Sequence, residues 1–373
     1  MTAGWQRKNV SEIATHSLGK MLDKAKNKGE PKKYLRNLNV RWFSFDLSDL
    51  LEMRFLPQEE SKYTVSKGDV VVCEGGYPGR AAIWEQDESI HFQKALHRVR
   101  FDEPERAIWF LYYLYLKDLD GSLKIHFNGA GIQHFTGEAL AQFQIPLPPL
   151  AEQRRIVALL NEAIAAIAIA KTNAEKSLLA ARELFNRAQA RVFGELKPGW
   201  EIKPLSEICV VDWGNTDLTK ASYIEGGQYL AVSAAGCDGR IAHKEHDKHT
   251  PVLSAIGAQC GRMYFPEEDF TAIKNTITLT PRAGQCTGRF LFWLLDHVEL
   301  PRRGAAQPFM AKGDIQSFLV RVPASLGDQV EISESLDELE ENVARLESLC
   351  IRKLAALDAL KQSLLHRAFS GQL

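Results

Sequence analysis

The stretch that decides the fold is "PLPPLAEQRRIVALLNEAIAAIAIAKTNAEKSLLAARELFNRAQARVFGEL", residues 146–196. Its prolines cannot lie inside a helix, so the sequence predicts a helix that begins near Leu150. Beyond that point apolar residues recur in steps of three and four, the pattern of a helix that packs against another helix. One additional step of four, from Ala174 to Leu178, forms a stutter. The apolar seam consists of Leu160, Ala163, Ile167, Ala170, Ala174, Leu178, Ala181, Phe185, Ala188 and Val192.

The same seam returns in the last part of the chain with identical spacing. All of its positions are apolar except Lys361, and the stutter falls at the same place. The ends also correspond, "FGEL" at 193–196 with "FSGQL" at 369–373. A second long helix is therefore predicted, with the seam Leu336, Leu339, Val343, Leu346, Cys350, Leu354, Leu357, Lys361, Leu364 and Ala368.

The regions that precede the two helices correspond as well. "GWQRKNVSEI" (4–13) and "GWEIKPLSEI" (199–208) share Gly, Trp, Lys, Ser, Glu and Ile at matching places. Each is followed by a buried strand that enters a Gly-rich turn, and then by an aromatic helix, "WFLYYLYL" (109–116) or "RFLFWLLD" (289–296). Because order, spacing and type agree, the chain is predicted to repeat one domain followed by one helix.

The predicted fold is mixed α/β. Two globular α/β domains are separated by two long antiparallel helices that form a coiled coil, and the halves are related by a pseudo-two-fold axis. The first seam is rich in Ala and the second in Leu, as close antiparallel packing requires. Two helices in separate bundles are the alternative. The predicted boundaries are 1–147 and 197–325 for the domains, and 148–196 and 326–373 for the helices.

Composition excludes several classes of protein. With 45% hydrophobic and 25% charged residues the chain is typical of globular proteins, and its polar, basic N-terminal segment favours a cytoplasmic location. Six cysteines without a CxxC pair disfavour a zinc ribbon. A net charge of -1 excludes a simple basic nucleic-acid binder, although Lys20 to Arg36 is locally basic and Asp328 to Glu347 locally acidic.

From "PLPPLAEQRRI", the long helix and "FGEL", with a second copy that ends in "LLHRAFSGQL", the whole sequence resembles the specificity (S) subunit of a type I restriction-modification system. The resemblance implies a non-catalytic DNA reader whose two target recognition domains each bind half of an asymmetric, interrupted target. It implies that the helices set the spacing and dock two modification (methyltransferase) subunits. S-adenosylmethionine would be bound by those subunits, with no cofactor in this chain, and two restriction (motor-nuclease) subunits would complete the complex. The second copy, "VPASLGDQVEI", departs from the Pro-Pro-Leu-x-Glu-Gln signature.

Motifs for catalysis are not found in the sequence. It contains no Asn-Pro-Pro-Tyr or Asp-Pro-Pro-Tyr motif, no GxGxxG and no Walker A sequence. The segment "HKEHDKH" places His243, His246 and His249 at equal spacing, either as a metal site or as an exposed loop near phosphates. We expect the exposed loop and no metal.

Candidates for DNA contact follow the Gly-rich turns. Gly79-Arg80 and Gly261-Arg262 occupy equivalent places after these turns, so each arginine is expected to read guanine or grip a phosphate, with ion pairing inside the protein as the alternative. The same alignment pairs Gln93-Lys94 with Asn275-Thr276, and a carboxamide suits adenine, although it could equally cap a loop. The basic candidates are Lys94 and Lys274, with Lys32, Lys33, Arg36, Lys248, Arg302 and Arg303 expected to anchor phosphates.

Three alternatives stay open at this point. Trp5 and Trp200 are expected to pack each domain against the helix ends, or else to stack on bases. For the whole chain, the second alternative replaces the DNA reader by a two-headed coiled-coil adaptor that binds protein partners, without DNA specificity. An enzyme with a dispersed site is the third.

Overall fold

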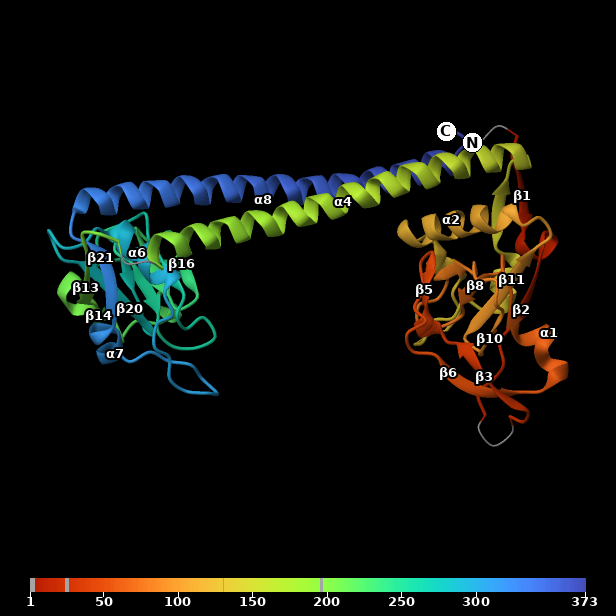
Figure 1. The fold of residues 1–373 in the computed structure, drawn as a ribbon, viewed down its shortest axis with the longest axis horizontal. Coiled ribbons are helices and arrows are strands. Elements are labelled where there is room, and N and C mark those ends of the chain that lie inside the picture. The colour runs from red at the N-terminus through yellow and green to blue at the C-terminus, as the bar shows by residue number, and fades with distance from the viewer. Residues whose placement is uncertain (1–3, 24–26, 130, 195–196) are drawn as a thin grey trace. The chain divides into compact units, whose positions relative to one another are not determined.

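A computed structural model of the chain describes residues 4–23, 27–129, 131–194 and 197–373 (Figure 1). Lys24 and Lys26 of the basic segment, and 195–196 of the "FGEL" sequence, lie outside the described residues. The chain divides into two compact units, Met1–Ala174 with Arg352–Leu373, and Glu175–Ile351. Each unit contains one globular domain together with a part of both long helices.

The domain of the first unit contains three main sheets. Strand β1 pairs with β12, a second sheet has the order β2-β11-β8-β9, and a third has the order β6-β3-β10-β7, in which β3 and β10 are parallel. Its strands are β1 (Gln6–Asn9), β2 (Ala14–Leu18), β3 (Glu30–Leu35), β4 (Val40–Arg41), β5 (Ser44–Phe45), β6 (Leu51–Phe55), β7 (Thr64–Val65), β8 (Val70–Cys73), β9 (Ala81–Ile83), β10 (Ile90–Phe92), β11 (Leu96–Phe101) and β12 (Gln144–Leu147). Its helices are α1 (Glu60–Tyr63), α2 (Glu105–Leu119) and α3 (Gly137–Gln142), with 3-10 turns η1 (Val10–Glu12), η2 (Asn37–Asn39), η3 (Pro57–Glu59) and η4 (Ser122–His126).

The domain of the second unit repeats this arrangement. Strand β13 pairs with β21, one sheet has the order β14-β20-β17-β18, and another has the order β16-β15-β19, with β15 and β19 parallel. Its strands are β13 (Trp200–Pro204), β14 (Cys209–Trp213), β15 (Tyr229–Ser233), β16 (Gly236–Ile241), β17 (Val252–Ser254), β18 (Met263–Tyr264), β19 (Phe270–Ala272), β20 (Thr276–Pro281) and β21 (Leu319–Pro323). Its helices are α5 (Leu205–Ile208), α6 (Gly288–His297) and α7 (Lys312–Ser317), with the 3-10 turn η5 (Lys220–Ser222). The predicted repeat and the mixed α/β class are confirmed.

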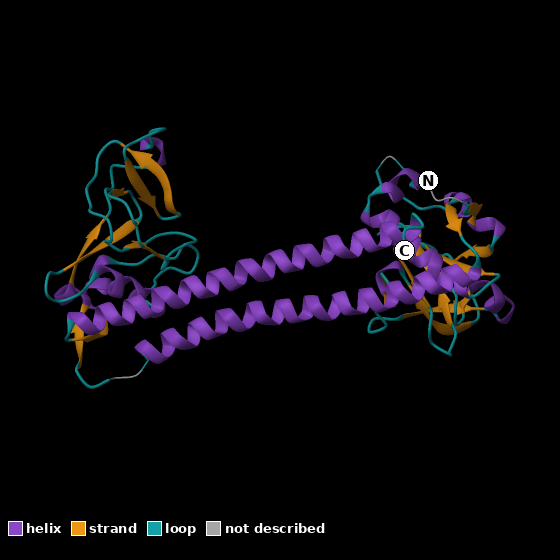
Figure 2. Ribbon diagram, turned by 90° about the horizontal axis from the view of Figure 1, so that it is seen from above, coloured by secondary structure: helices purple, strands orange, loops and turns teal. Residues whose placement is uncertain are grey.

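Two long helices follow the domains, α4 (Leu150–Phe193) and α8 (Leu326–Phe369), each of 44 residues (Figure 2). The first begins at the predicted residue. The second begins without the double proline, because Ser325 caps it: the Asp328 N–H donates to Ser325 Oγ at 3.4 Å. Part of α4 is long and apolar enough to cross a membrane. Core helices of soluble proteins have the same length and composition, so this feature alone does not indicate a membrane span.

The predicted seams are the buried faces of these helices. All seam residues of α4 are buried or half-buried, and so are those of α8 apart from Leu346, at 41% exposure. The polar member, Lys361, donates from Nζ to the Tyr115 hydroxyl at 2.8 Å and lies over its ring. A lysine is therefore accommodated in an apolar seam by a partner from the domain.

The helices are antiparallel where the first unit contains them both. Arg155 Nη2 donates to the Leu373 carbonyl at 2.7 Å, and Lys171 Nζ lies 2.9 Å from Asp358 Oδ1. From the first pair to the second, the residue number in α4 rises while that of its C-terminal partner falls. In the second unit Arg182 Nε lies 2.5 Å from Glu347 Oε1. The alternative of separate bundles is wrong.

A glutamine in the first turn of each long helix ties it to its domain. Gln153 is 1% exposed and donates from Nε2 to the Pro148 carbonyl at 2.7 Å. Gln329, fully buried, donates from Nε2 to the Pro323 carbonyl at 3.1 Å and to the Gln285 carbonyl at 3.1 Å. Its Oε1 accepts from the N–H of Thr287, the residue that caps α6, at 2.9 Å.

Each opening tryptophan packs near a helix end. The Trp5 ring lies edge-on to Trp109 at 5.8 Å, and Trp109 lies 4.4 Å from Phe369 of α8. In the second unit Trp200 and Phe193 both contact Phe290, at 6.2 and 5.8 Å. The packing prediction for both tryptophans is confirmed.

Candidate nucleic-acid interface

The Gly-rich turn has the same hydrogen bonds in both units. In the first, the Cys73 N–H donates to the Arg80 carbonyl and the Gly79 N–H to the Cys73 carbonyl, both at 2.8 Å. In the second, the Ser254 N–H donates to the Arg262 carbonyl and the Gly261 N–H to the Ser254 carbonyl, both at 2.8 Å. Gly79 and Gly261 have φ of 83° and 96°, which favours glycine. The predicted equivalence of Arg80 and Arg262 is confirmed.

The two arginines nevertheless have different surroundings. Arg80 is half-buried, donates from Nη2 to the Asn37 carbonyl at 3.0 Å, and lies 5.1 Å from the centre of the Tyr77 ring. Its guanidinium therefore stabilises the domain itself. Arg262 is exposed, and its hydrogen bond to Gln259 Oε1 is long, at 3.4 Å. It also lies 5.9 Å from the centre of the Tyr264 ring.

A second arginine lies on the same turn in the second unit. A Cβ added at Gly261 would lie 2.5 Å from Nη2 of Arg302, so the Arg302 guanidinium covers this glycine. Arg302 is exposed, and no ion pair to it is found among the described residues. In the first unit the corresponding place over Gly79 is taken by Leu123 and Phe127, which are apolar.

Two further segments adjoin this turn. The Ala255 N–H donates to the Asn275 carbonyl at 2.9 Å, and the Met310 N–H donates to the Ala255 carbonyl at 2.9 Å. The structure thus brings the loop that contains Lys274 and Asn275 to the turn, together with the hairpin formed by residues 303–309. Arg303, at the start of that hairpin, donates to both carboxylate oxygens of Asp314, at 2.7 and 2.6 Å. Its charge is paired with a carboxylate of the same unit, although the Arg303 side chain is exposed.

The predicted equivalence of Gln93 with Asn275 is wrong. Ala95 and Asn275 both have positive φ, 85° and 73°, and their carbonyls accept from Glu74 and Ala255 of the two turns. Asn275 therefore corresponds to Ala95. The segment between the Gly-Arg pair and β10 is two residues longer than the segment between the Gly-Arg pair and β19, so the alignment of the two Gly-Arg pairs does not persist to these strands.

The corrected register changes the interpretation of these side chains. Lys94 now corresponds to Lys274, and both are exposed. Gln93 corresponds to Ile273; the Gln93 N–H donates to the Leu35 carbonyl and the Ile273 N–H to the Val232 carbonyl. Asparagine tolerates a left-handed backbone, which favours the loop-capping interpretation of Asn275.

Arg36 follows β3 in the first unit. It donates from Nη2 to Asp49 Oδ2 at 2.6 Å and to the Asp49 carbonyl at 2.7 Å, and its side chain is 15% exposed. Arg36, Arg80 and Gln93 gather near the end of β3, but both guanidinium groups bind protein atoms there. They leave little free charge for phosphates.

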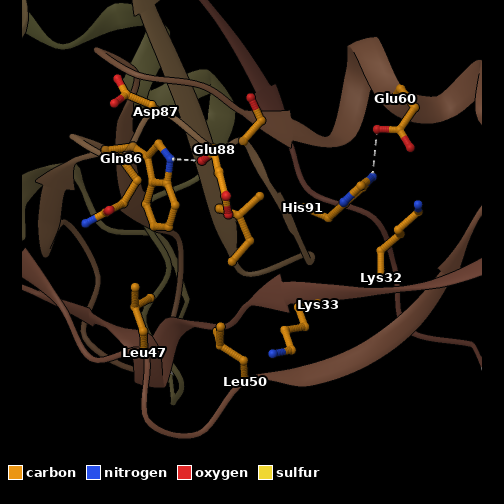
Figure 3. A pocket seen from close by; sticks show the side chains of 12 residues that line it. Lys32, Lys33, Leu47, Leu50, Glu60, Gln86, Asp87, Glu88 and His91 are labelled. Carbon is orange, nitrogen blue, oxygen red and sulfur yellow. Dashed lines mark hydrogen bonds and ion pairs between the residues drawn. The ribbon is translucent and has the colours of Figure 1, made fainter.

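Lys32 and Lys33 line a large cavity of the first unit, about 840 Å³ (Figure 3). His91 Nε2 lies 3.0 Å from Glu60 Oε2 at its wall, and burial lowers the pKa of His91 despite that carboxylate. Lys32 Nζ lies 3.3 Å from Glu30, whereas Lys33 is exposed. Sequence reasoning missed this polar set, because no motif marks it. Four consecutive residues also line the cavity, Gln86, Asp87, Glu88 and Ser89.

The histidine segment of the second unit does not converge on one point. The His246 ring packs on Phe270, and the His249 ring stacks on Phe265 with Nε2 3.1 Å from Glu267. In the part of the chain that the structure describes, no group of three or more His, Cys, Asp or Glu is arranged to hold a metal ion. Lys248 lies on the same exposed loop, and its N–H donates to Asp269.

Comparisons with known proteins agree with this architecture. The family model "Type I restriction modification DNA specificity domain" matches residues 2–178 and 197–352. The "Type I restriction enzyme EcoDI specificity subunit" of Escherichia coli is 28% identical over 188 residues, 48% of this chain and 40% of that protein. The match thus spans less than half of the relative.

Two solved structures have the same fold. A chain from work on complex assembly and conformational transition of the type I R-M system has a TM-score of 0.77 at 21% identity, covering 100% of this chain and 99% of that one. The HsdS subunit from Thermoanaerobacter tengcongensis has a TM-score of 0.66 at 21% identity, covering 100% and 98%.

Proposed function

Because the chain belongs to the type I restriction-modification DNA specificity family, we propose that it is the subunit that reads the DNA target of such a system. Each domain, 1–147 and 197–325, reads one half of an interrupted, asymmetric target. The helices connect the two readers, and sequence choice is the contribution of this chain. Catalysis belongs to its partners.

One observation carries this proposal: the two domains share strand order and turn geometry but differ in their exposed chemistry. The same Gly-rich turn presents a half-buried, carbonyl-bound Arg80 in one unit and an exposed Arg262 beside Arg302 in the other. Two copies of one fold with different exposed side chains suit two different half-sites. DNA sequence is read by such side chains at base edges, while phosphate contacts set position.

Exposed apolar side chains on the helices support docking of two modification subunits. Apolar side chains that stay exposed on a long helix are the surface that a docked partner would cover. They occur on both helices, at Leu159, Ile169, Leu179, Leu184, Leu346, Leu349, Ile351 and Leu360. In this proposal those subunits bind S-adenosylmethionine and methylate adenine at N6 in the cytoplasm, and restriction subunits join the same complex.

Methylome sequencing of cells that carry the intact system tests the proposal. One interrupted N6-methyladenine motif should be present and should vanish when this chain is deleted. A motif that persists after deletion would refute the proposal. The adaptor alternative predicts no sequence-specific methylation that depends on this chain.

A second test addresses the net charge of -1. The modification subunits are expected to supply much of the phosphate clamp, so the isolated chain should bind target and non-target DNA with similar, weak affinity. In a gel-shift assay at fixed salt, the assembled complex should discriminate and the isolated chain should not. Equal discrimination by the isolated chain would contradict this division of labour.

A further inference from the structure

We propose that Arg262 and Arg302 are the guanine-reading residues of the second domain, and that the equivalent turn of the first domain reads no base. This inference rests on the proposed function. Each guanidinium would donate two parallel hydrogen bonds to O6 and N7 of a guanine in the major groove. The ligand is thus duplex DNA with guanine in the half-site of the second domain.

The first support is charge that the protein leaves unneutralised. The Arg302 guanidinium covers Gly261, and Arg262 directly follows Gly261 in the sequence. Two positive side chains therefore lie at one short turn. Neither forms an ion pair with a carboxylate among the residues that the structure describes. Asp296 interacts with Arg262 only through longer-range attraction, and burial outweighs that attraction and raises the pKa of Asp296. Acceptors from outside the chain would therefore complete this site.

The second support is the rigidity of the backbone on both sides. The Arg262 N–H donates to the Gln259 carbonyl at 3.0 Å, and its carbonyl accepts from Ser254. Arg303, which follows Arg302, exchanges backbone hydrogen bonds with Phe309 at 2.8 and 2.9 Å and is fixed by Asp314. Reading a base requires such fixed stems, because a loosely held fork loses its geometric selectivity.

The third support is the comparison between the repeats. The first unit builds the same turn with Leu123 and Phe127 in the place of Arg302, and with Arg80 bound to the Asn37 carbonyl. The turn therefore folds without an exposed arginine pair. Arg262 lacks the carbonyl bond that holds Arg80, and the turn of the first unit folds with apolar residues in the place of Arg302, so recognition is the better explanation of this exposed pair.

The planar fork also distinguishes these residues from the lysine nearby. Lys274 is exposed on the adjoining loop and offers a point charge suited to phosphate. The planar arginine fork matches the two acceptors of guanine. The lysine ammonium does not reproduce this fixed paired geometry. Phosphate anchoring by Lys274 and guanine reading by the two arginines are thus complementary.

The test uses the complete system in cells, with the chain carrying Arg262→Lys or Arg302→Lys. Lysine keeps the charge but loses the fork. We expect methylation to spread to targets in which one guanine of one half-site is replaced, with discrimination at that position reduced about 10- to 100-fold. The other half-site should be unchanged. The matched control is Arg240→Lys, because Arg240 is a half-buried arginine of the same unit that is already paired with Glu268; the methylation motif of this variant should match the wild type.

Several outcomes would overturn the proposal. An unchanged motif would do so, as would relaxation in both half-sites. Alanine variants could weaken binding to every DNA sequence by the same factor and lower its salt dependence by about one phosphate contact. That result would make these residues phosphate anchors instead. A wild-type chain with no interrupted motif would refute the proposed function itself, and the guanine assignment would fall with it.

Discussion

Replacing Gln329 by leucine should destabilise the second unit far more than the same change at Gln153 destabilises the first. Gln329 makes hydrogen bonds to Thr287, Gln285 and Pro323, whereas Gln153 makes one, to Pro148. Leucine keeps a similar volume and helix propensity but no donor or acceptor. At about 1 kcal/mol for each buried hydrogen bond, we expect losses of about 3 kcal/mol for Gln329 and about 1 kcal/mol for Gln153 in the free energy of unfolding.

Hydrogen exchange of the full chain, resolved by peptide, measures both losses separately. Gln329→Leu should accelerate exchange in α6 and β21 by about 100-fold, since about 1.4 kcal/mol corresponds to a factor of ten. Gln153→Leu should accelerate exchange in β12 and α2 by less than about tenfold. Equal effects of the two changes, or a change below about threefold in α6, would refute the assignment of Gln329 as the tie between helix and domain.

Two further predictions concern the first unit. Burial lowers the pKa of His97 from 6.5 to about 4, so below pH 6.5 the unfolded chain takes up a proton that the folded unit excludes. Stability should therefore fall as the pH drops from 6.5 towards 4, by roughly 3 kcal/mol in total. In urea unfolding, His97→Gln should flatten this pH dependence, whereas the control His243→Gln, at an exposed position, should leave it unchanged. Arg80→Ala should lower the unfolding free energy of this unit by about 1 to 2 kcal/mol, because it removes the bond to the Asn37 carbonyl and the contact with the Tyr77 ring. Hydrogen exchange in this unit should accelerate accordingly, and unchanged exchange rates would argue that Arg80 is free for DNA.

The repeat explains why so much of the fold could be predicted from the sequence. Two copies of one pattern constrain each other, so the start of α4 at Leu150 and both seams were correctly located. The start of α8 followed from the repeat even though its prolines are missing. Lys361, the one polar residue in the second seam, has its explanation in Tyr115, a partner from the domain that periodicity cannot reveal.

The site was predicted less well, for two physical reasons. A difference in loop length between the copies shifted the register, and Gln93 was therefore paired with Asn275 instead of Ile273. Partners distant in sequence also decide whether a basic side chain is free. Asp49 binds Arg36, and no periodicity in the sequence marks this ion pair. Arg80 and Arg262 looked alike for the same reason, since the Asn37 carbonyl that holds Arg80 is remote in the chain.

The most direct test of two-domain reading is an insertion of two helical turns beside the stutter in each long helix, followed by methylome sequencing. Two turns, about seven residues, add about 10 Å at about 1.5 Å per residue, which is about three base pairs of DNA. The proposed function predicts the same two half-sites, with a spacer about three base pairs longer. Unchanged spacing, or altered half-sites, would contradict the claim that two separate domains read the target and the helices set the distance between them.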